Sequence, residues 1–337
     1  MPTEISDWND LDNVRNDLTG DYVLVNDLDS GTDGYAGIGD DFTPIGVGLD
    51  NNFNGTFDGG GFAINDLVVE IDVDTVGLFG AVNRDTTNTV IIENLSVAGS
   101  VTDTGSGSRV GGLVGFLDDD GSGEIKNCVS HVDVTSDGER VGGLVGLNND
   151  TVTDSYATGS VEGDERVGGL VGNNSGTVTE SYATGSVEGG EEVGGLVGLN
   201  IGTVTDSYWD TETTGQSDSD GGTGLTTAEM QGSEAETNMT GFDFSNVWST
   251  VEEEEKPEID GLVPEQDGYP ILLSVDEDEQ LESQGIQKLR NIARTETDTD
   301  GNYSADIPGA TGDTIAVAVD FDDGTERYGR LITTVIE

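Results

Sequence analysis

Acidic side chains are the residues of this chain that could most readily do chemistry. Asp154, Glu180 and Asp206 recur at intervals of 26 residues. Most glycoside hydrolases use a pair of carboxylates, so these acids are candidates for acid–base catalysis. Acids are so abundant here, however, that pairs at a suitable spacing arise by chance, and a repeated acid is usually a solvated or cation-binding row. We therefore expect a chain that is not an enzyme.

A second candidate site is a calcium-binding turn formed by Asp298, Asp300 and Asn302. These residues offer oxygen ligands at alternating positions, as calcium loops do. The closing glutamate of an EF-hand is missing, because Gly309 stands at its position. Asp-rich segments also make good turns without any ion. The segment predicts a turn, and Ca²⁺ is the one cofactor that the sequence suggests.

Three arginines form a third candidate, a stripe that could contact sugars or anions. Arg109, Arg140 and Arg166 each directly precede a copy of the phrase Val-Gly-Gly-Leu-Val-Gly. Arginines stacked at strand spacing would repel one another, so we expect neighbouring acids to lie between them. The acids available are Glu139, Asp164, Glu165 and Glu191. A solvated charge ladder is the simpler interpretation, and a contact stripe is the alternative.

The chain has one cysteine, Cys128, and one histidine, His131. A single cysteine permits no internal disulfide, and a single histidine leaves no histidine pair for catalysis or metal binding. In the alignment of the repeats, Cys128 takes the position that Tyr156, Tyr182 and Tyr208 have in the later repeats. We therefore predict that Cys128 is a small buried residue.

The elements that must position these side chains are repeats. The phrase Val-Gly-Gly-Leu-Val-Gly begins at Val110, Val141, Val167 and Val193, and a weaker relative begins at Val76. Such a period indicates stacked structural units. One unit contains three strand-like runs, at 167–171, 178–182 and 186–187. Three short strands per unit predict the triangular coil of a right-handed parallel β-helix, within an all-β chain.

The glycines of the repeated phrase are predicted to be structural. Glycine in a strand marks a bend or a close approach of two backbones, which stacked coils require. A phosphate cradle is disfavoured because no lysine follows the glycines and the phrase occurs four times. The predicted repeat core consists of Gly112, Leu113, Gly115, Gly143, Leu144, Gly146, Gly169, Leu170, Gly172, Gly195, Leu196 and Gly198.

The charge of the chain limits its surroundings and its partners. There are 68 acidic and 12 basic residues among 337, which gives a formal net charge of −56. Such a surface is typical of a halophilic, most readily archaeal, protein, because concentrated salt screens the repulsion. A calcium-laden acidic protein is the alternative. A polyanion repels nucleic acids and anionic membranes, and no apolar run is long enough for a membrane helix. The N-terminus does not resemble a secretory signal.

Four regions follow from these patterns. Residues 1–75 form an N-terminal cap with entry coils, in which Ser6 begins a helix and Gly20 ends it. Residues 76–208 form the repeats. Residues 209–274 form a C-terminal cap and linker, with a helix starting at Thr226 or Thr227. Its aromatic cluster, which we expect to plug the far end of the stack, contains Phe242, Phe244, Val247 and Trp248.

The last region, 275–337, is predicted to be a small antiparallel β domain of sandwich type. A helix is expected over 281–294 and strands over 303–307, 315–321 and 328–336. This region holds four of the arginines, at positions 290, 294, 327 and 330. The local relief of negative charge suggests a docking surface, so we expect this domain to anchor or oligomerise the chain.

The repeats resemble the GLUG repeat family. The resemblance rests on the four Gly-Leu-Val-Gly copies and on the phrase Thr-Val-Thr-Asp-Ser-Tyr-Ala-Thr-Gly-Ser-Val that follows them. The segments 22–29, 44–46 and 53–59 resemble the usual entry to such repeats, and 207–210 and 224–230 resemble the usual exit. The resemblance covers about residues 5–273. The resemblance implies a large cell-surface protein similar to adhesins. The family has no catalytic residues common to all members, so the resemblance implies none here.

These observations lead to one functional hypothesis with two alternatives. We expect a non-enzymatic structural or attachment protein on a virion surface, such as a spike, turret or tail fibre of a haloarchaeal virus. Its partners would be other virion proteins, bound through the C-terminal domain, and a host glycan or surface-layer protein. Homo-oligomers are also possible by this hypothesis. We expect no binding to nucleic acid and no insertion into a membrane. A cellular adhesin or surface-layer-associated protein at the cell surface is the first alternative. A β-helix enzyme that degrades polysaccharide is the second.

Overall fold

The computed structural model describes residues 1–48, 50–82, 89–105, 109–118, 122–251, 268–275, 280, 314–322 and 327–335, the last two ranges by their backbone. The chain divides into two compact units. One consists of Met1–Glu252 with Asp267–Gln284, and the other of Glu253–Gln266 with Gly285–Glu337. The predicted helix over 281–294 and the predicted calcium turn at Asp298, Asp300 and Asn302 lie outside the described residues.

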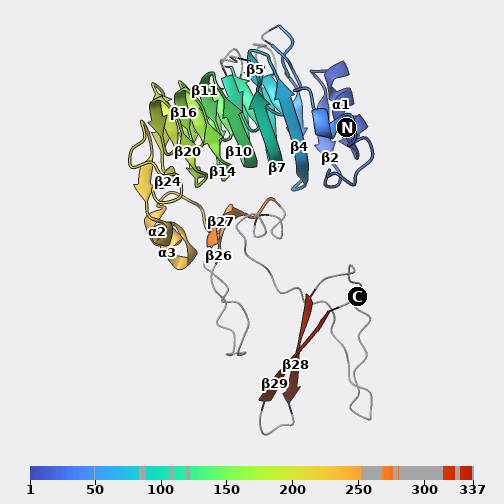
Figure 1. Ribbon diagram of the computed structural model, residues 1–337, viewed down its shortest axis with the longest axis vertical. Coiled ribbons are helices and arrows are strands. Elements are labelled where there is room, and N and C mark those ends of the chain that lie inside the picture. Colours follow the sequence, from blue (N-terminus) through green and yellow to red (C-terminus); the bar gives the residue numbers. More distant parts are fainter. Residues whose placement is uncertain are drawn as a thin grey trace. The chain divides into compact units, whose positions relative to one another are not determined.

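The first unit is a parallel β-solenoid with three sheets along its length (Figure 1). Two of the sheets have five strands each, one strand from each of five successive coils. One of them consists of β5 (Thr75–Val76), β8 (Arg109–Gly111), β11 (Glu139–Gly142), β16 (Glu165–Gly168) and β21 (Glu191–Gly194). The other consists of β6 (Phe79–Val82), β9 (Val114–Leu117), β12 (Val145–Asn148), β17 (Val171–Asn174) and β22 (Val197–Asn200).

The third and largest sheet has 15 strands and runs from the entry of the solenoid to its exit. Its entry strands are β1 (Thr3–Ile5), β2 (Asp21–Leu24), β3 (Thr56–Asp58), β4 (Ala63–Ile71), β7 (Thr89–Asp103) and β10 (Ser122–Ser136). Later coils contribute shorter strands, namely β13 (Thr151–Thr153), β14 (Tyr156–Ala157), β15 (Val161–Glu162), β18 (Thr177–Thr179), β19 (Tyr182–Ala183), β20 (Val187–Glu188), β23 (Thr203–Thr205), β24 (Tyr208–Asp210) and β25 (Thr223–Leu225). The predicted all-β parallel solenoid is therefore confirmed.

Equivalent residues of successive coils lie directly beside one another. Val141 pairs with Val167, and Tyr156 pairs with Tyr182, which in turn pairs with Tyr208. Paired strands are about 4.8 Å apart. Each repeated residue type therefore forms a column along the solenoid, and this geometry places like charges as well as like apolar groups next to each other.

The repeated Val-Gly-Gly-Leu-Val-Gly phrase turns a corner, whereas we predicted a single strand over 167–171. In one coil β16 ends at Gly168 and β17 begins at Val171, so Gly169 and Leu170 join two sheets. A Cβ atom on Gly169 would lie 2.3 Å from the carbonyl oxygen of Gly195 in the next coil. The glycine is required because no side chain fits between the coils. All predicted repeat-core positions are buried.

The entry of the solenoid is covered by a short helix, α1 (Trp8–Asn13), followed by the 3-10 turn η1 (Val14–Asn16). The helix begins one residue later than predicted, because the carboxylate of Asp7 accepts a hydrogen bond from the backbone N–H of Asp10 at 2.8 Å. Ser6 instead donates its hydroxyl to Asp10. The helix also ends well before Gly20. A second 3-10 turn, η2, spans Gly39–Asp41.

Trp209 and the loop after it close the exit of the solenoid. Trp209 pairs with Ala183, so an indole enters the core where earlier coils have a methyl group. Ser219 then accepts hydrogen bonds on its hydroxyl from the N–H groups of Leu196 and Val197, at 3.2 and 2.9 Å. The loop thus satisfies backbone groups at the last edge of the stack, as sheet edges require.

The predicted aromatic plug lies on the flank of the solenoid rather than at its end. Phe242 and Trp248 pack against the column of tyrosines on the outer face of the largest sheet. We call residues 226–251 together with 268–275 the flank segment. It contains α2 (Thr227–Met230), α3 (Gly232–Asn238), β26 (Trp248–Val251) and β27 (Gly268–Leu272). Thr226 caps α2 through a capping box with Glu229, as predicted.

Two apolar cores result from this arrangement. The larger one fills the inside of the solenoid, and the smaller one lies between the tyrosine column and the flank segment. Cys128 belongs to the inner core and is fully buried, as predicted. Its predicted alignment was wrong by one residue, because Val129, and not Cys128, pairs with Tyr156. Burial raises the pKa of the Cys128 thiol to about 12.

In the second unit the described residues form one antiparallel strand pair, β28 (Thr314–Asp322) and β29 (Arg327–Val335). These strands confirm the predicted ones over 315–321 and 328–336. The strand predicted over 303–307 lies outside the described residues. Among the helices that the structure describes, none has the length and apolar character needed to span a membrane.

Candidate functional site: two charged columns on the solenoid

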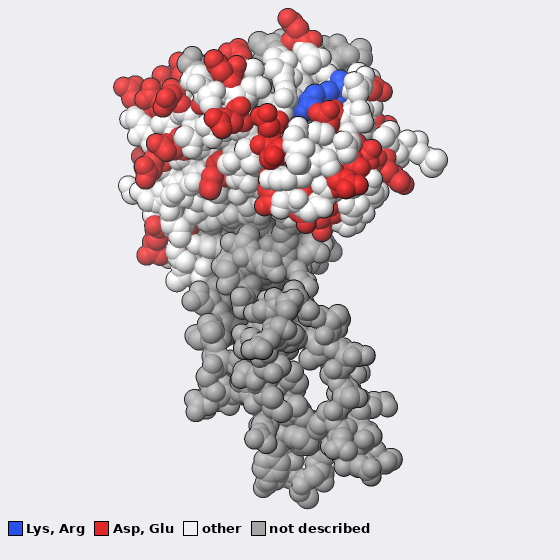
Figure 2. Space-filling view, turned by 45° about the vertical axis from the view of Figure 1, so that its right-hand side comes forward, with Lys and Arg blue, Asp and Glu red and all other residues white. Residues whose placement is uncertain are grey.

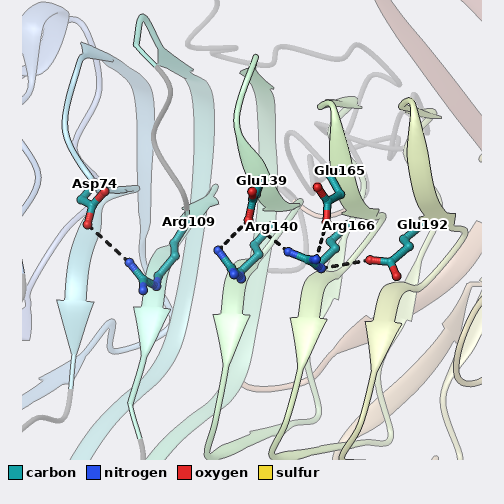
Figure 3. A network of polar contacts seen from close by, with 7 residues as sticks. All are labelled: Asp74, Arg109, Glu139, Arg140, Glu165, Arg166 and Glu192. Atoms are coloured by element: carbon teal, nitrogen blue, oxygen red, sulfur yellow. Dashed lines mark hydrogen bonds and ion pairs between the residues drawn. The ribbon is translucent and has the colours of Figure 1, made fainter.

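The arginine stripe runs across the neighbouring strands β8, β11 and β16, near the residue at which each strand begins (Figure 3). Arg140 and Arg166 adopt φ angles of 58° and 55°, in the left-handed region that non-glycine residues enter rarely. Glu192 adopts the same conformation in the next coil, with φ of 51°. The coil therefore imposes this backbone bend whether the side chain is basic or acidic.

Arg166 is the centre of the stripe. One of its terminal nitrogens lies 3.0 Å from the carboxylate of Glu139 in the preceding coil, and its Nε lies 2.9 Å from Glu192 in the following one. Arg166 also forms an ion pair with Glu165. Glu139 in turn lies 3.1 Å from Arg140. Glu139 thus lies between the guanidinium groups of Arg140 and Arg166, as we predicted, and Glu165 is a second predicted acid that contacts Arg166.

Arg109 occupies the first position of the stripe. Its Nη1 lies 3.6 Å from the carboxylate of Asp74, and its guanidinium carbon lies 4.9 Å from the centre of the Phe116 ring. A cation over an aromatic face is attracted by the negative face of the ring. All three arginines are therefore engaged by neighbours within the solenoid, and their use as a contact stripe stays a prediction.

Acidic groups dominate the face of the solenoid that is visible in Figure 2. Figure 2 shows carboxylates spread over the visible face of the solenoid, with basic side chains gathered at a single place. The guanidinium side chains of Arg109, Arg140 and Arg166 are only 19–24 % exposed. The carboxylates of the stripe are therefore more exposed than its guanidinium groups.

The predicted column of Asp154, Glu180 and Asp206 is present, at the turn before the tyrosine column. All three residues have positive φ angles, of 45°, 48° and 45°. Asp154 is 6 % exposed, and its carboxylate accepts a hydrogen bond from the indole N–H of Trp248 at 3.3 Å. Glu180 is the neighbour of Asp154 in the next coil, because Thr153 pairs with Thr179. Ionised carboxylates at strand spacing repel one another.

The pKa of Glu180 is raised to about 7. Partial burial is the main cause, followed by the hydrogen bond with Asp154 and by the negative charges of Asp154, Asp206 and Asp243. A carboxylic acid with such a pKa holds a proton at mildly acidic pH. This property is what a general acid needs, and it also allows the pair to hydrogen-bond.

His131 and Cys128 lie on opposite faces of the largest sheet. The His131 ring contacts Tyr156 edge-on, and its Nδ1 lies 2.6 Å from the hydroxyl of Thr158. Burial lowers the pKa of His131 to about 4. Cys128 points into the inner core, where its thiol lies 3.3 Å from the carbonyl oxygen of Lys126. The structure thus gives both residues places in the packing and does not bring them together.

Two polar groups of the solenoid escaped the sequence analysis. Asn148, Asn174 and Asn200 form an amide column with hydrogen bonds of 2.8 Å, in which Asn148 and Asn174 are buried and Asn200 is half-buried. Their equal spacing was the available signal. Asp210 is fully buried and accepts hydrogen bonds from Tyr269 and Thr227 at 2.5 and 2.6 Å. It fastens the last coil to the flank segment, and no local pattern announced it.

Metal binding finds no further candidate in the described part of the chain. No group of three or more His, Cys, Asp or Glu side chains there is arranged to hold an ion. The predicted calcium turn lies beyond those residues. Ca²⁺ at Asp298, Asp300 and Asn302 therefore stays a prediction.

Comparison with known proteins agrees with the repeats. Residues 106–135, 137–162 and 163–188 match the GLUG motif. No curated protein matches the chain. A crystal structure from Bacteroides ovatus, provisionally described as an immunoglobulin A1 protease, is similar with a TM-score of 0.53 and 19 % identity, over 82 % of this chain and 93 % of that one. At this identity the likeness shows the fold alone. The chain is thus a parallel β-solenoid that carries GLUG repeats.

Proposed function

We propose that the chain is a non-enzymatic rod, exposed on a surface, that makes structural or attachment contacts. The observation that carries this proposal is the repetition of outer side chains in register. Thr177 and Thr179 lie beside Thr151 and Thr153 of the preceding coil, and beside Thr203 and Thr205 of the next. Each coil therefore offers the same contact group at a fixed spacing, and several weak contacts of this kind add up to firm attachment.

The setting that we propose is halophilic, and the place is the surface of a virion. A net charge of −56 supports a salt-rich medium, because salt at molar concentration reduces the Debye length to about 3 Å. A rigid rod could serve as a spike, turret or tail fibre. The C-terminal unit would then join the rod to other virion proteins or to further copies of the chain. A cellular adhesin or surface-layer-associated protein is the alternative that uses the same features.

The partner that fits this surface is a host glycan or a surface-layer protein adapted to salt. The threonine rows are uncharged and lie within an acidic surface. A neutral polymer can meet them without electrostatic cost, whereas the phosphates of nucleic acids would be repelled.

The test is binding of the purified, fluorescently labelled chain to isolated haloarchaeal envelopes in about 3 M KCl, above the 1 M at which the Debye length has already fallen to about 3 Å. We expect saturable binding that a variant with Thr151, Thr177 and Thr203 changed to Glu loses. A variant with glutamates at the exposed positions Ser175 and Ile201 is the matched control and should bind normally. Equal binding by both variants would rule out the threonine rows, and absence of binding by the wild type would rule out attachment to these envelopes.

An enzymatic alternative is favoured by one observation, the raised pKa of Glu180 beside Asp154. A polysaccharide-degrading enzyme would need both groups to reach a substrate, whereas Asp154 lies beneath Trp248. Incubation with host glycans, followed by chromatography of the products, separates the two proposals. Products that disappear with Glu180→Gln would support the enzyme, and intact glycans would support the rod. The similarity to the Bacteroides ovatus protein extends to the fold only and gives no support to either proposal.

A further inference from the structure

The turn between β12 and β13 carries a sequence motif that the attachment function does not use. Asn149-Asp150-Thr151 has the form Asn-X-Ser/Thr, which is the acceptor sequence for N-linked glycosylation. Asn302 begins a sequence of the same form but lies outside the described residues. The folded surroundings of the others decide which of them can hold a sugar. Besides Asn149, these are Asn54, Asn94, Asn173 and Asn238.

The side chain of Asn149 is accessible in the folded chain. Its backbone N–H donates to the carbonyl oxygen of Leu117 at 2.9 Å, which holds the turn in place. Its side chain is half-buried and forms no hydrogen bond among the residues that the structure describes. Ser175 and Ile201 stand at the same place in the next two coils and are exposed, Ile201 to 73 %. This turn therefore faces solvent in all three coils.

The hydroxyl group that completes the motif is accessible as well. Thr151 begins β13, in which the side chain of Val152 is fully buried in the inner core. Because successive side chains of a strand alternate between its two faces, Thr151 points outward. Its hydroxyl donates to the carboxylate of Asp150 at 3.4 Å, inside the motif itself. The amide nitrogen and the hydroxyl that a transferase must reach therefore both lie on the outer surface.

Two of the other asparagines have no room for a sugar. Asn173 is only 8 % exposed. Asn94 donates its side-chain N–H to Asp58 at 3.1 Å, and the residue that completes its motif, Ser96, is fully buried. A glycan at either position would force apart groups that pack against each other in the solenoid.

The remaining two asparagines have side-chain amide nitrogens that are already engaged. Asn54 donates to the side-chain oxygen and the backbone carbonyl of Asn52, at 2.5 and 3.2 Å. Asn238, the last residue of α3, donates to the carbonyl oxygens of Glu229 and Glu234, at 3.2 and 3.0 Å. Glycosylation of either residue must break these bonds and leaves the acceptors without their donor. Asn149 needs no such change.

We propose that Asn149 is the N-glycosylation site of this chain. The inference rests on the proposed surface function, because N-glycosylation belongs to proteins that are exposed outside the cell. The donor is an oligosaccharide whose anomeric carbon is linked to a lipid phosphate. In the transfer, the amide nitrogen of Asn149 bonds to that carbon and gives up one proton to a base of the transferase. The bond from the carbon to the phosphate oxygen breaks, and the lipid phosphate leaves with the bonding electrons.

The experiment incubates the purified, unglycosylated full chain with permeabilised haloarchaeal membranes, which supply the transferase and its lipid-linked donor, in molar KCl. Glycopeptides are identified by mass spectrometry after proteolysis. We expect a glycan on Asn149 and none on Asn94 or Asn173. Asn238 should be occupied about tenfold less than Asn149, because its two hydrogen bonds must break first. A chain unfolded before incubation is the control in which all the motifs are open to the transferase.

Two variants of Thr151 separate recognition of the motif from an effect on folding. Thr151→Ala removes the hydroxyl and should abolish the glycan on Asn149, whereas Thr151→Ser keeps the motif and should retain it. Asn149→Gln removes the acceptor nitrogen and should also yield no glycan in this turn. Circular dichroism in the same salt confirms that each variant has the wild-type fold.

The inference would be overturned by a folded chain that stays unmodified at Asn149 while the unfolded chain is glycosylated there. Absence of a glycan on Asn149 in both forms, with a peptide from a glycoprotein of the same membranes as the active control, would overturn it too, as would preferred use of Asn94 or Asn173. These outcomes do not depend on where the chain acts, because the membranes meet it directly. Failure of the proposed function would show separately, as a chain that does not bind envelopes with or without the glycan.

Discussion

The rings of Tyr156 and Tyr182 stack face to face, with centroids 4.6 Å apart and planes 5° from parallel. The spacing is that of neighbouring strands, so the backbone register sets the ring contact. Tyr156 donates its hydroxyl to Gln280, and Tyr182 donates to the carbonyl of Pro270. The column therefore joins two roles, since its rings form the second core and its hydroxyls fasten the flank segment.

Tyr182→Phe should keep this stack and destabilise the chain. It removes the hydroxyl that donates to the buried carbonyl of Pro270 at 2.7 Å, and an unsatisfied buried acceptor costs about 1–3 kcal/mol. Chemical denaturation at constant molar KCl measures the change in the free energy of unfolding. Tyr35→Phe is the control, because its hydroxyl bonds to Asp66 at an exposed place, and it should cost less than about 0.5 kcal/mol. Equal costs would contradict the role of the buried bond.

Gly169→Ala should destabilise the solenoid strongly. The new methyl group would lie 2.3 Å from the carbonyl oxygen of Gly195 and 2.9 Å from the Cβ of Ala183. Both neighbours belong to the packed interior, so the coils must separate, at a cost of about 3 kcal/mol or more. The midpoint of denaturation reports this cost. Ser175→Ala, at an exposed turn of the same coil, should leave the midpoint unchanged; a tolerated Gly169→Ala would show that the coils can shift.

The repeats made the solenoid predictable, whereas the residue at which each strand ends was not. A fixed period places Val167 on Val141 whatever the details of the coil, so stacking follows from spacing alone. A bend or close approach was predicted at the glycines, but the strand was expected to continue to Val171, because Val-Gly-Gly-Leu-Val reads as one apolar run. Glycine allows both a strand and a bend, so its type could not decide between them.

The contacts of the flank segment were beyond the reach of the sequence. Trp248 and Asp154 are 94 residues apart, and no periodicity relates them. The sequence showed the aromatic cluster but not the surface that it covers. The open end of the stack and the column of tyrosines on its flank are both apolar, so the cluster could pack against either. The acids between the arginines were predictable because they share the repeat. Cys128 was misaligned by one residue because its coil has a different length from the later ones.

Removal of salt should unfold the chain. At 0.1 M salt the Debye length is about 10 Å, so carboxylates on neighbouring coils repel almost unscreened, whereas at 1 M it is about 3 Å. We expect a cooperative β spectrum by circular dichroism in molar KCl and loss of structure well below that. Sucrose at matched osmolality is the control for non-ionic effects. Full β structure in dilute buffer with a calcium chelator would exclude a halophilic protein.

Arg166→Gln should raise the KCl concentration that the folded chain requires. Arg166 pairs with Glu139 and Glu192 from the two adjacent coils, and its loss leaves these acids facing each other without a cation. Exposed ion pairs contribute about 0.2–1 kcal/mol each, and screening reduces this. We therefore expect a midpoint of salt-dependent unfolding at higher KCl, measured by circular dichroism, and little difference from the wild type at 3 M KCl, where by the same screening argument the pairs are weak. Glu192→Gln, which removes one acid beside Arg166, is the counterpart and should cost less at low salt.

His131 should make the chain less stable in mild acid, opposite to the effect of Glu180. Burial lowers the pKa of His131 from 6.5 to about 4, so the unfolded chain binds the proton more tightly. Its contribution to stability is complete above pH 6.5, falls as the pH decreases towards 4, and changes no further below that. His131→Gln removes the titration and can still reach the Thr158 hydroxyl. The comparison is made with Glu180→Gln present in both chains, because this change removes the opposing titration. Between pH 4 and 7 the chain with His131→Gln should then lose less free energy of unfolding than the chain that retains His131. Parallel curves would mean that His131 is accessible to protons in the folded chain.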